Sequence, residues 1–444
     1  MSEGCRLALL RNDDDGTFRV VLDGVAGPPF DHVDRQFLSF SPDGRRLAYI
    51  AARSGSECVV VDRAAGPKFD EIVRGSLSFS PDGKRFAYIG SQGGSPVVMV
   101  DGEASPVLKV VGEEMVIFSP DGKRFAYVAG DGLTQWVVTD GKASPPYEGI
   151  LGGTITFSPD ARRLAYGARE YNREVVVVDG VPGPPVDRIR YRSLRFSPDG
   201  RRFAYVADMA GRQQVVIDGI AYPEVAAIGT EGPLFSPDGN RFAYVAMNEG
   251  KEFVTVDGLE GELFDAIIPG SLVFSPDGKR YAFAARRGDK GVVVVDGKAG
   301  DWYDGIMVGT PVFSPDGKRF AYGARKADRH SVVIDGIPGP EFDSLGRDML
   351  KFSPDGSRLA YAASRNGHWH LVVDGTLGPE FEGIVADSIT FSPDGKRLAY
   401  LAGSGGRQRV VVDGKIGPAC DFHPATRLRF SPGGRRFAYA LARD

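Results

Sequence analysis

The sequence is poor in the residues that build disulfide frameworks and metal centres. Its 444 residues include only three cysteines and five histidines. Three cysteines are too few for a disulfide framework, so we expect Cys5, Cys58 and Cys420 to be buried thiols. His368 and His370 flank Trp369 without a third ligand, which is too little for a zinc site. We therefore expect no metal and no cofactor.

Long apolar runs are also missing, and charges of opposite sign nearly balance. No stretch approaches the roughly 18 apolar residues of a membrane span. The apolar run at residues 7–10 is shorter than the roughly 7–15 residues of a signal-peptide core. The net charge of −4 gives no general reason to bind nucleic acid or an acidic membrane. We expect a cytoplasmic monomer with no nucleic-acid partner and no membrane span. A periplasmic or extracellular location would follow if a leader had been removed.

Catalytic motifs are absent as well. The sequence contains no Gly-x-Ser-x-Gly elbow, Walker loop, His-Glu-x-x-His motif or paired-cysteine metal site. The segment from Asn12 to Gly16 is similar to a calcium loop but lacks an acidic first ligand. It also has Leu22 where a bidentate glutamate would fall, so we expect a hairpin turn. No catalytic residue is predicted.

Glycine and proline are abundant, with 59 and 30 residues, and they follow one repeat. The tripeptide Phe-Ser-Pro occurs eleven times between Phe40 and Phe430, at 39-residue steps without an insertion or deletion. An aspartate keeps the same step from Asp23 to Asp413. Self-similarity at this length is the signature of a repeat architecture.

Each repeat reads as four short strands, which we call a, b, c and d. In one repeat, strand a covers 76–79, strand b begins at 86 and strand c covers 97–100. Ser-Pro-Asp-Gly joins a to b and Asp-Gly joins c to d, and both sequences suit tight turns. A proline-marked strand d follows, as at 66–69. Four strands in about 40 residues are typical of a propeller blade.

The string Phe-Ser-Pro-Asp-Gly-Lys-Arg-x-Ala-Tyr resembles the WD-like repeat of TolB-type β-propellers. That repeat is also found in the propeller domains of the tricorn protease and prolyl oligopeptidase families. The resemblance covers nearly the whole chain. It implies a fold but no particular function, because those propellers serve very different proteins.

We predict an all-β fold, with residues 1–444 forming one closed ring of about eleven four-stranded blades. The N-terminal segment 6–33 and the C-terminal segment 427–441 would share the closing blade. Both segments contain a strand b, so either could supply that strand. Two smaller propellers in tandem are the alternative, although no linker or altered period interrupts the repeat.

One arginine recurs in every repeat, two residues beyond the a–b turn. Eleven copies at one structural position predict a scaffold role rather than eleven anion sites. We expect each guanidinium to tie the a–b turn to the c–d turn through a bidentate carboxylate bridge. The alanine and tyrosine of strand b, as at Ala48 and Tyr49, are predicted core positions. The arginines are Arg46, Arg85, Arg124, Arg163, Arg202, Arg241, Arg280, Arg319, Arg358, Arg397 and Arg436.

An up-and-down blade places the b–c and d–a loops together at one end. These loops vary between the repeats, whereas the turns at the other end hardly change, so variation gathers on one face. Loops on a rigid scaffold are the usual place for recognition, although a solvated mixed-charge rim would look similar. The candidate residues of this variable face are Arg169, Tyr171, Arg173, Arg190, Tyr191, Arg192, Arg286, Arg287, Arg325, His368, Trp369 and His370.

These features favour a non-enzymatic scaffold that binds a protein or peptide through the variable face. One alternative is a small-ligand or metal-dependent enzyme or sensor with a site at the mouth of a central channel. Another is a structural module of a larger protein.

Overall fold

The computed structural model of the chain describes residues 6–106, 108–112, 116–307, 309, 311–347, 349–420 and 428–439. Cys5, the side chain of Cys420, and residues 427 and 440–441 of the predicted closing blade lie outside this description. Strands dominate the described residues, whose one helical element is the 3-10 turn η1 (Arg35–Phe37). None of their helical segments is long and apolar enough to cross a membrane.

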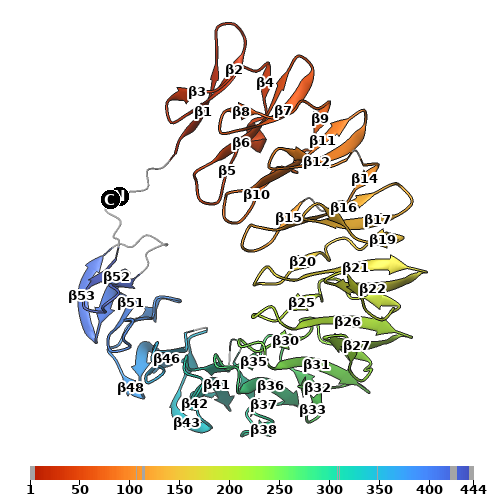
Figure 1. Cartoon of the computed structure of the whole chain (residues 1–444). Helices are drawn as coiled ribbons and strands as arrows, with labels where there is room; N and C mark the ends of the chain where they lie inside the picture. Colours follow the sequence, from red (N-terminus) through yellow and green to blue (C-terminus); the bar gives the residue numbers. More distant parts are fainter. Residues whose placement is uncertain are drawn as a thin grey trace. The chain divides into compact units, whose positions relative to one another are not determined.

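The chain divides into two compact units, residues 1–223 and 224–444, which we call unit 1 and unit 2. Unit 1 contains one three-stranded and five five-stranded sheets. Unit 2 contains five five-stranded sheets and one two-stranded sheet among its described residues. Within each unit, consecutive sheets follow one another along the chain (Figure 1). The division lies between β28 (Ile220–Ala221) and β29 (Ala227–Ile228).

Every complete sheet is built around strands b and c, which form its long central hairpin. In unit 1 these pairs are β6 (Leu47–Arg53) with β7 (Ser56–Val61), β11 (Phe86–Gln92) with β12 (Ser95–Val100), β16 (Phe125–Gly130) with β17 (Gln135–Thr139), β21 (Leu164–Glu170) with β22 (Arg173–Val178), and β26 (Phe203–Met209) with β27 (Arg212–Ile217). In unit 2 they are β31 (Phe242–Asn248) with β32 (Lys251–Val256), β36 (Tyr281–Arg287) with β37 (Lys290–Val295), β41 (Phe320–Lys326) with β42 (Arg329–Ile334), β46 (Leu359–Arg365) with β47 (His368–Val373), and β51 (Leu398–Ser404) with β52 (Arg407–Val412).

The edges of each sheet are short strands, as the sheet of β11 and β12 illustrates. Strand d is β13 (Glu103–Ala104), which pairs with β12. On the other side, β9 (Glu71–Ile72) and β10 (Ser78–Phe79) both pair with β11, at its two ends. The predicted a–b–c–d meander is therefore confirmed, and each sheet has the strand order of a propeller blade.

Strand a was predicted at 76–79, where β10 lies, and a turn separates β10 from an earlier piece, β9, that the sequence analysis did not predict. In the sheet of β11, the Ser76 hydroxyl donates to the carbonyl oxygen of Val73 (2.6 Å) and accepts from the amide of Ile89 (2.9 Å). The hydroxyl thus accepts the hydrogen bond of a strand-b amide that would pair with a backbone carbonyl if strand a ran without a break. The same pair of bonds is made by Thr154, Ser193, Ser271 and Ser388.

Neighbouring sheets within a unit pack face to face, each pair with a core of its own. Ala48 and Ile50 of one sheet, for example, share a buried cluster with Tyr88 and Val97 of the next. The predicted core role of the strand-b alanine and tyrosine is confirmed, since Ala48 and Tyr49 are both buried. Burial also raises the pKa of Tyr49 to about 12. An aromatic ring shortly after strand d often meets this tyrosine edge-on, as Phe30 meets Tyr49 with 6.4 Å between ring centroids.

The terminal segments form partial sheets. β1 (Ala8–Asn12), β2 (Phe18–Leu22) and β3 (Val25–Ala26) make the three-stranded sheet of unit 1. β54 (Arg429–Phe430) pairs with β55 (Phe437–Ala438) in unit 2. Both predicted strands b therefore exist, β1 in the first segment and β55 in the second. A closed ring of eleven blades remains a prediction.

The segment resembling a calcium loop is a hairpin turn between β1 and β2, as predicted. The amide of Asp13 donates to the carbonyl oxygen of Thr17 (2.8 Å). The Asp13 carboxylate forms ion pairs with Arg11 (2.6 Å) and Arg19 (2.5 Å). These two arginines neutralise its charge.

Candidate functional site

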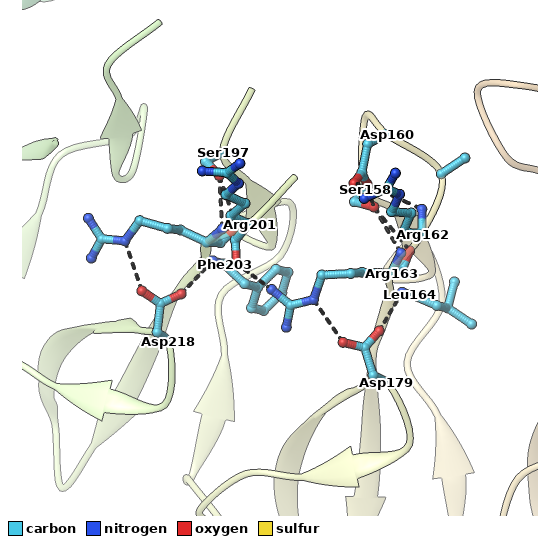
Figure 2. Close-up of polar contacts among 12 residues, drawn as sticks. Ser158, Asp160, Arg162, Arg163, Leu164, Asp179, Ser197, Arg201, Phe203 and Asp218 are labelled. Carbon is cyan, nitrogen blue, oxygen red and sulfur yellow. Dashed lines mark hydrogen bonds and ion pairs between the residues drawn. The ribbon is translucent and has the colours of Figure 1, made fainter. Parts of the chain in front are cut away.

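The conserved end of each repeat, with its a–b and c–d turns, is held by the recurring arginine (Figure 2). Nε of Arg163 donates to Oδ2 of Asp179 (2.8 Å), and the amide of Leu164 donates to Oδ1 of the same carboxylate (2.9 Å). The predicted tie between the a–b and c–d turns is present. The predicted bidentate bridge is wrong, because a backbone amide takes the second carboxylate oxygen. Ten arginines from Arg46 to Arg397 form this ion pair, at 2.6–3.2 Å.

The same guanidinium also reaches the next sheet, a contact that we did not predict. Nη1 of Arg163 donates to the carbonyl oxygen of Arg201, in the a–b turn of the following sheet (2.6 Å). Its guanidinium carbon lies 5.4 Å from the ring centroid of Phe196 in that sheet. The arginine therefore joins two turns of its own sheet and one turn of the neighbour. For Arg436, the structure shows its amide donating to the Ser431 hydroxyl (3.1 Å).

The Ser-Pro-Asp-Gly turn is closed by its own side chains. The Ser158 hydroxyl donates to Oδ1 of Asp160 (2.5 Å) and accepts from the amide of Arg163 (2.9 Å). The hydroxyl bond, followed by a bond from the amide of Arg162, lowers the pKa of Asp160 below its ordinary value. These side chains are occupied within the turn, so this end of the repeat has a structural role.

At the opposite, variable end the connections between strands b and c are tight turns. Strands b and c around Tyr171 and Asn172 are joined by only these two residues, with φ of +49° and +59°. The Glu148 carboxylate, which precedes the sheet's own strand b, accepts from the amide of Tyr171 (3.1 Å). Acidic residues at the same repeat position hold the turns at Gly93, Ala210, Gly288 and Ala327. The repeats therefore differ here in side chains, which a rigid backbone presents.

Several predicted site residues serve the fold. Arg173 pairs with Asp187 (3.1 Å), and Arg169 with Glu174 (3.5 Å). The exposed Arg325 donates from Nη2 to the carbonyl oxygen of Asp304 (3.2 Å).

Arg287 has a similar structural role in unit 2. It pairs with Glu262 (2.7 Å), and its guanidinium lies 5.4 Å from the ring centroids of both Phe264 and Trp302. Its neighbour Arg286 is exposed, and Arg190 in unit 1 is half-buried.

The His-Trp-His segment is divided between core and surface. His370 is buried, and its Nδ1 lies 3.0 Å from the carbonyl oxygen of Gly378. Trp369 is half-buried against the cluster of Phe381 and Leu371, whereas His368 is exposed. Within the described residues, no group of three or more His, Cys, Asp or Glu side chains could hold a metal ion. Cys58 is a buried free thiol, as predicted.

Two tyrosines of unit 1 remain well exposed. Tyr171 is 83% exposed on its b–c turn, and Tyr191 is 63% exposed. Tyr191 and Arg192, whose guanidinium lies 5.1 Å from the Tyr191 ring centroid, were predicted in a d–a loop. They occupy the break in strand a, between β24 (Arg188–Ile189) and β25 (Arg195–Phe196).

Leu133 is a candidate that the sequence analysis missed. It is 88% exposed in the b–c turn of the sheet before that of Tyr171. The Asp131 carboxylate accepts from the amides of Leu133 (2.9 Å) and Thr134 (2.8 Å), so the turn is ordered. A large apolar residue within Asp-Gly-Leu-Thr was the available signal. We call Leu133 and Tyr171 the turn pair, because they lie on the b–c turns of consecutive sheets.

Comparison with known proteins gives structural likenesses at low sequence identity. No family model and no curated protein matches the sequence. TolB from Acinetobacter baumannii is 17% identical, with 49% of this chain and 62% of TolB covered and a TM-score of 0.24. The Dos1 propeller is 14% identical, with 77% and 93% covered and a TM-score of 0.30. The dihydro-heme d1 dehydrogenase NirN is 17% identical, with 67% and 72% covered and a TM-score of 0.28.

Because these TM-scores are below 0.5, the likenesses carry no argument, and the fold rests on the sheets themselves. The strict 39-residue period, the a–b–c–d meanders and the cores between consecutive sheets all belong to one architecture. The chain therefore has the repeat architecture of a β-propeller, and its repeats resemble the WD-like repeat of TolB-type propellers.

Proposed function

We propose that the chain is a non-enzymatic scaffold that binds a protein or peptide through the turn pair of unit 1. The observation that carries this proposal is the state of Tyr171. Its φ of +49° lies in the left-handed region, which costs a residue with a side chain roughly 1–2 kcal/mol. Its ring is 83% exposed and gains little from burial. The same left-handed φ occurs at Ser54, Ala210 and Ala327 on the equivalent turns, so the exposed aromatic ring is what sets Tyr171 apart.

The surroundings of the turn pair suit recognition. Tyrosine is a frequent anchor of protein interfaces, and Tyr171 projects from the turn that ends strand b. The bond from the amide of Tyr171 to Glu148 holds the turn before a partner arrives. Such preorganisation lowers the entropic cost of binding. A standard interface buries roughly 800 Å² on each partner, so the contact would extend beyond these two turns.

The test is an unbiased pull-down with the intact chain and with the double variant Leu133→Ser, Tyr171→Ser. Serine is the native residue at the equivalent Ser54, where φ is +54°, so the turn tolerates it. We expect wild type to recover a partner that the double variant loses, with unchanged thermal stability. The matched control is Val181→Ser, which alters a 69% exposed apolar residue beside the Asp179-Gly180 turn. The control should retain the partner.

Two results would contradict the proposal. One is recovery of the same partners by the double variant. The other is recovery of no specific partner by wild type.

A further inference from the structure

A pocket in unit 2 opens between two neighbouring sheets, on their strand-a edges. It has a volume of 310 Å³ and lies between β29 with β30 (Leu234–Phe235) and β34 (Ala266–Ile267) with its following loop. Its walls are largely aliphatic, with contributions from Ile228, Leu234, Val245, Met247, Ile268 and Leu272.

Gly229 lines this pocket and contributes no side chain to it. Other repeats place Val73, Leu151 or Met307 at this position. A Cβ at Gly167 would lie 2.8 Å from Leu151, so that leucine fills the equivalent space. Met307 lines the equivalent pocket in a later sheet, which has only 160 Å³.

Val245 faces Gly229 and takes up the room beside it. A Cβ at Gly229 would lie 3.0 Å from Cβ of Val245. Val245 is only half-buried, whereas Ile50 and Val206 at the equivalent positions are buried. An apolar wall of Val245 is therefore left accessible from the pocket.

One carboxylate in this apolar pocket lacks the cation that its counterparts have. Oε2 of Glu252 accepts from the amide of Ile267 (2.6 Å). The equivalent Glu57 makes that bond and is also neutralised by both terminal nitrogens of Arg74 (2.6 Å each). Unit 2 has Pro269 at the position of Arg74. The adjacent Lys251 pairs with Asp265, and no described cation pairs with Glu252.

We propose that this pocket binds an organic cation, an ammonium or guanidinium group on an apolar stem. The aliphatic walls suit the stem, and the half-buried carboxylate of Glu252 suits the charge. A volume of 310 Å³ is at the small end of ligand pockets, which fits a compact amine or one long side chain. A free amine and a lysine or arginine side chain share this chemistry. The inference does not rest on the proposed function, since it concerns different residues.

Two variants separate charge recognition from folding. Glu252→Gln removes the charge, and the chain already uses Gln135 at this position, whose Oε1 accepts from the amide of Ile150 (2.8 Å). Pro269→Arg places an arginine where Arg74 neutralises Glu57. Glu57→Gln is the matched control, because its carboxylate already has a cation.

The experiment is calorimetric titration of the full chain with hexylammonium, and with hexanol as the neutral analogue. We expect wild type and Glu57→Gln to bind hexylammonium in preference to hexanol. Glu252→Gln and Pro269→Arg should bind it about tenfold to hundredfold more weakly, as expected for loss of a charged hydrogen bond. Equal affinity for hexanol, unchanged binding by Glu252→Gln, or no binding by wild type would overturn the proposal.

A second titration identifies the source of the cation. A terminally blocked peptide with one lysine that competes with hexylammonium indicates a side chain as occupant. A peptide that does not compete indicates a free amine. Failure of both titrations would leave the pull-down test of Leu133 and Tyr171 unaffected.

Discussion

Replacing Arg241 by alanine tests whether the recurring arginine connects consecutive sheets. Nε of Arg241 donates to Oδ2 of Asp257 (2.7 Å), within its own sheet. Its Nη1 donates to the carbonyl oxygen of Lys279 in the next sheet (2.6 Å). Its guanidinium also lies 5.5 Å from the ring centroid of Tyr281. We expect Arg241→Ala to weaken both the sheet and its contact with the next one.

The size of the effect follows from these contacts. A partly exposed ion pair contributes up to about 1 kcal/mol. A hydrogen bond from a charged donor contributes about 1.5 kcal/mol, and an exposed cation–π contact about 0.5 kcal/mol. In this variant the Asp257 carboxylate still accepts a hydrogen bond from the amide of Phe242 (3.0 Å), so it keeps one partner. We expect a loss of about 2–3 kcal/mol, or about 4–12 °C in Tm for a unit of this size.

Thermal unfolding and hydrogen exchange give the two readouts. The a–b turn of the next sheet contains bonds from the amides of Ser275 and Gly278 (2.9 and 2.8 Å). Their exchange should accelerate in Arg241→Ala, because the arginine no longer holds the carbonyl of Lys279. Lys279→Ala is the control. It removes an exposed side chain and keeps that carbonyl, so its stability should change by less than about 0.5 kcal/mol.

An unchanged Tm would refute a stabilising role for this arginine. Faster exchange confined to residues 236–258 would refute the connection between sheets, while leaving the tie within one sheet intact.

Two further predictions concern the Ser-Pro-Asp-Gly turn. Ala161 stands where the other turns have glycine, and its φ of +63° is unfavourable for a residue with a side chain. Ala161→Gly should therefore raise the free energy of unfolding, measured by chemical denaturation, by about 1 kcal/mol. An unchanged free energy would show that this backbone conformation is not strained. The Ser197 hydroxyl and then the amide of Arg201 lower the pKa of Asp199 below its ordinary 3.8, and nine equivalent aspartates from Asp43 to Asp394 are lowered in the same way. Because a lowered folded pKa stabilises above the unfolded value, this stability should be lost as pH falls below about 4. Ser197→Ala should therefore reduce the acid sensitivity of Tm, and an unchanged pH profile would contradict this.

The sequence predicted the strands and turns well because these depend on local chemistry. Asp62 at φ +48° and Gly83 at φ +72° occupy backbone states that Asp-Gly and Ser-Pro-Asp-Gly sequences favour. Strand b could be placed because it follows the Ser-Pro-Asp-Gly turn, and its buried Ala48 confirmed the placement. The break in strand a was not predictable in this way, because Ser76 must meet the amide of Ile89 across the ladder.

Binding through the variable face stays a prediction, but the places of its residues can be compared with the sequence analysis. The sequence placed the variable residues at one end of the repeats, and Tyr171 does lie exposed there. It gave no means to separate Tyr171 from Arg173, whose charge is taken by Asp187, fourteen residues away. Leu133 was missed because one exposed leucine has no sequence signature beyond its turn.

The sequence by itself determined the 39-residue period, the all-β class and the turn chemistry, because these arise within one repeat. Tertiary structure alone decided which charges are neutralised and which spaces are filled. Arg163 reaches the carbonyl of Arg201, and Val245 takes up the room beside Gly229, through contacts between strands or sheets that lie apart in the sequence. Such contacts depend on how two surfaces pack against each other, and no sequence pattern within a single repeat specifies that packing.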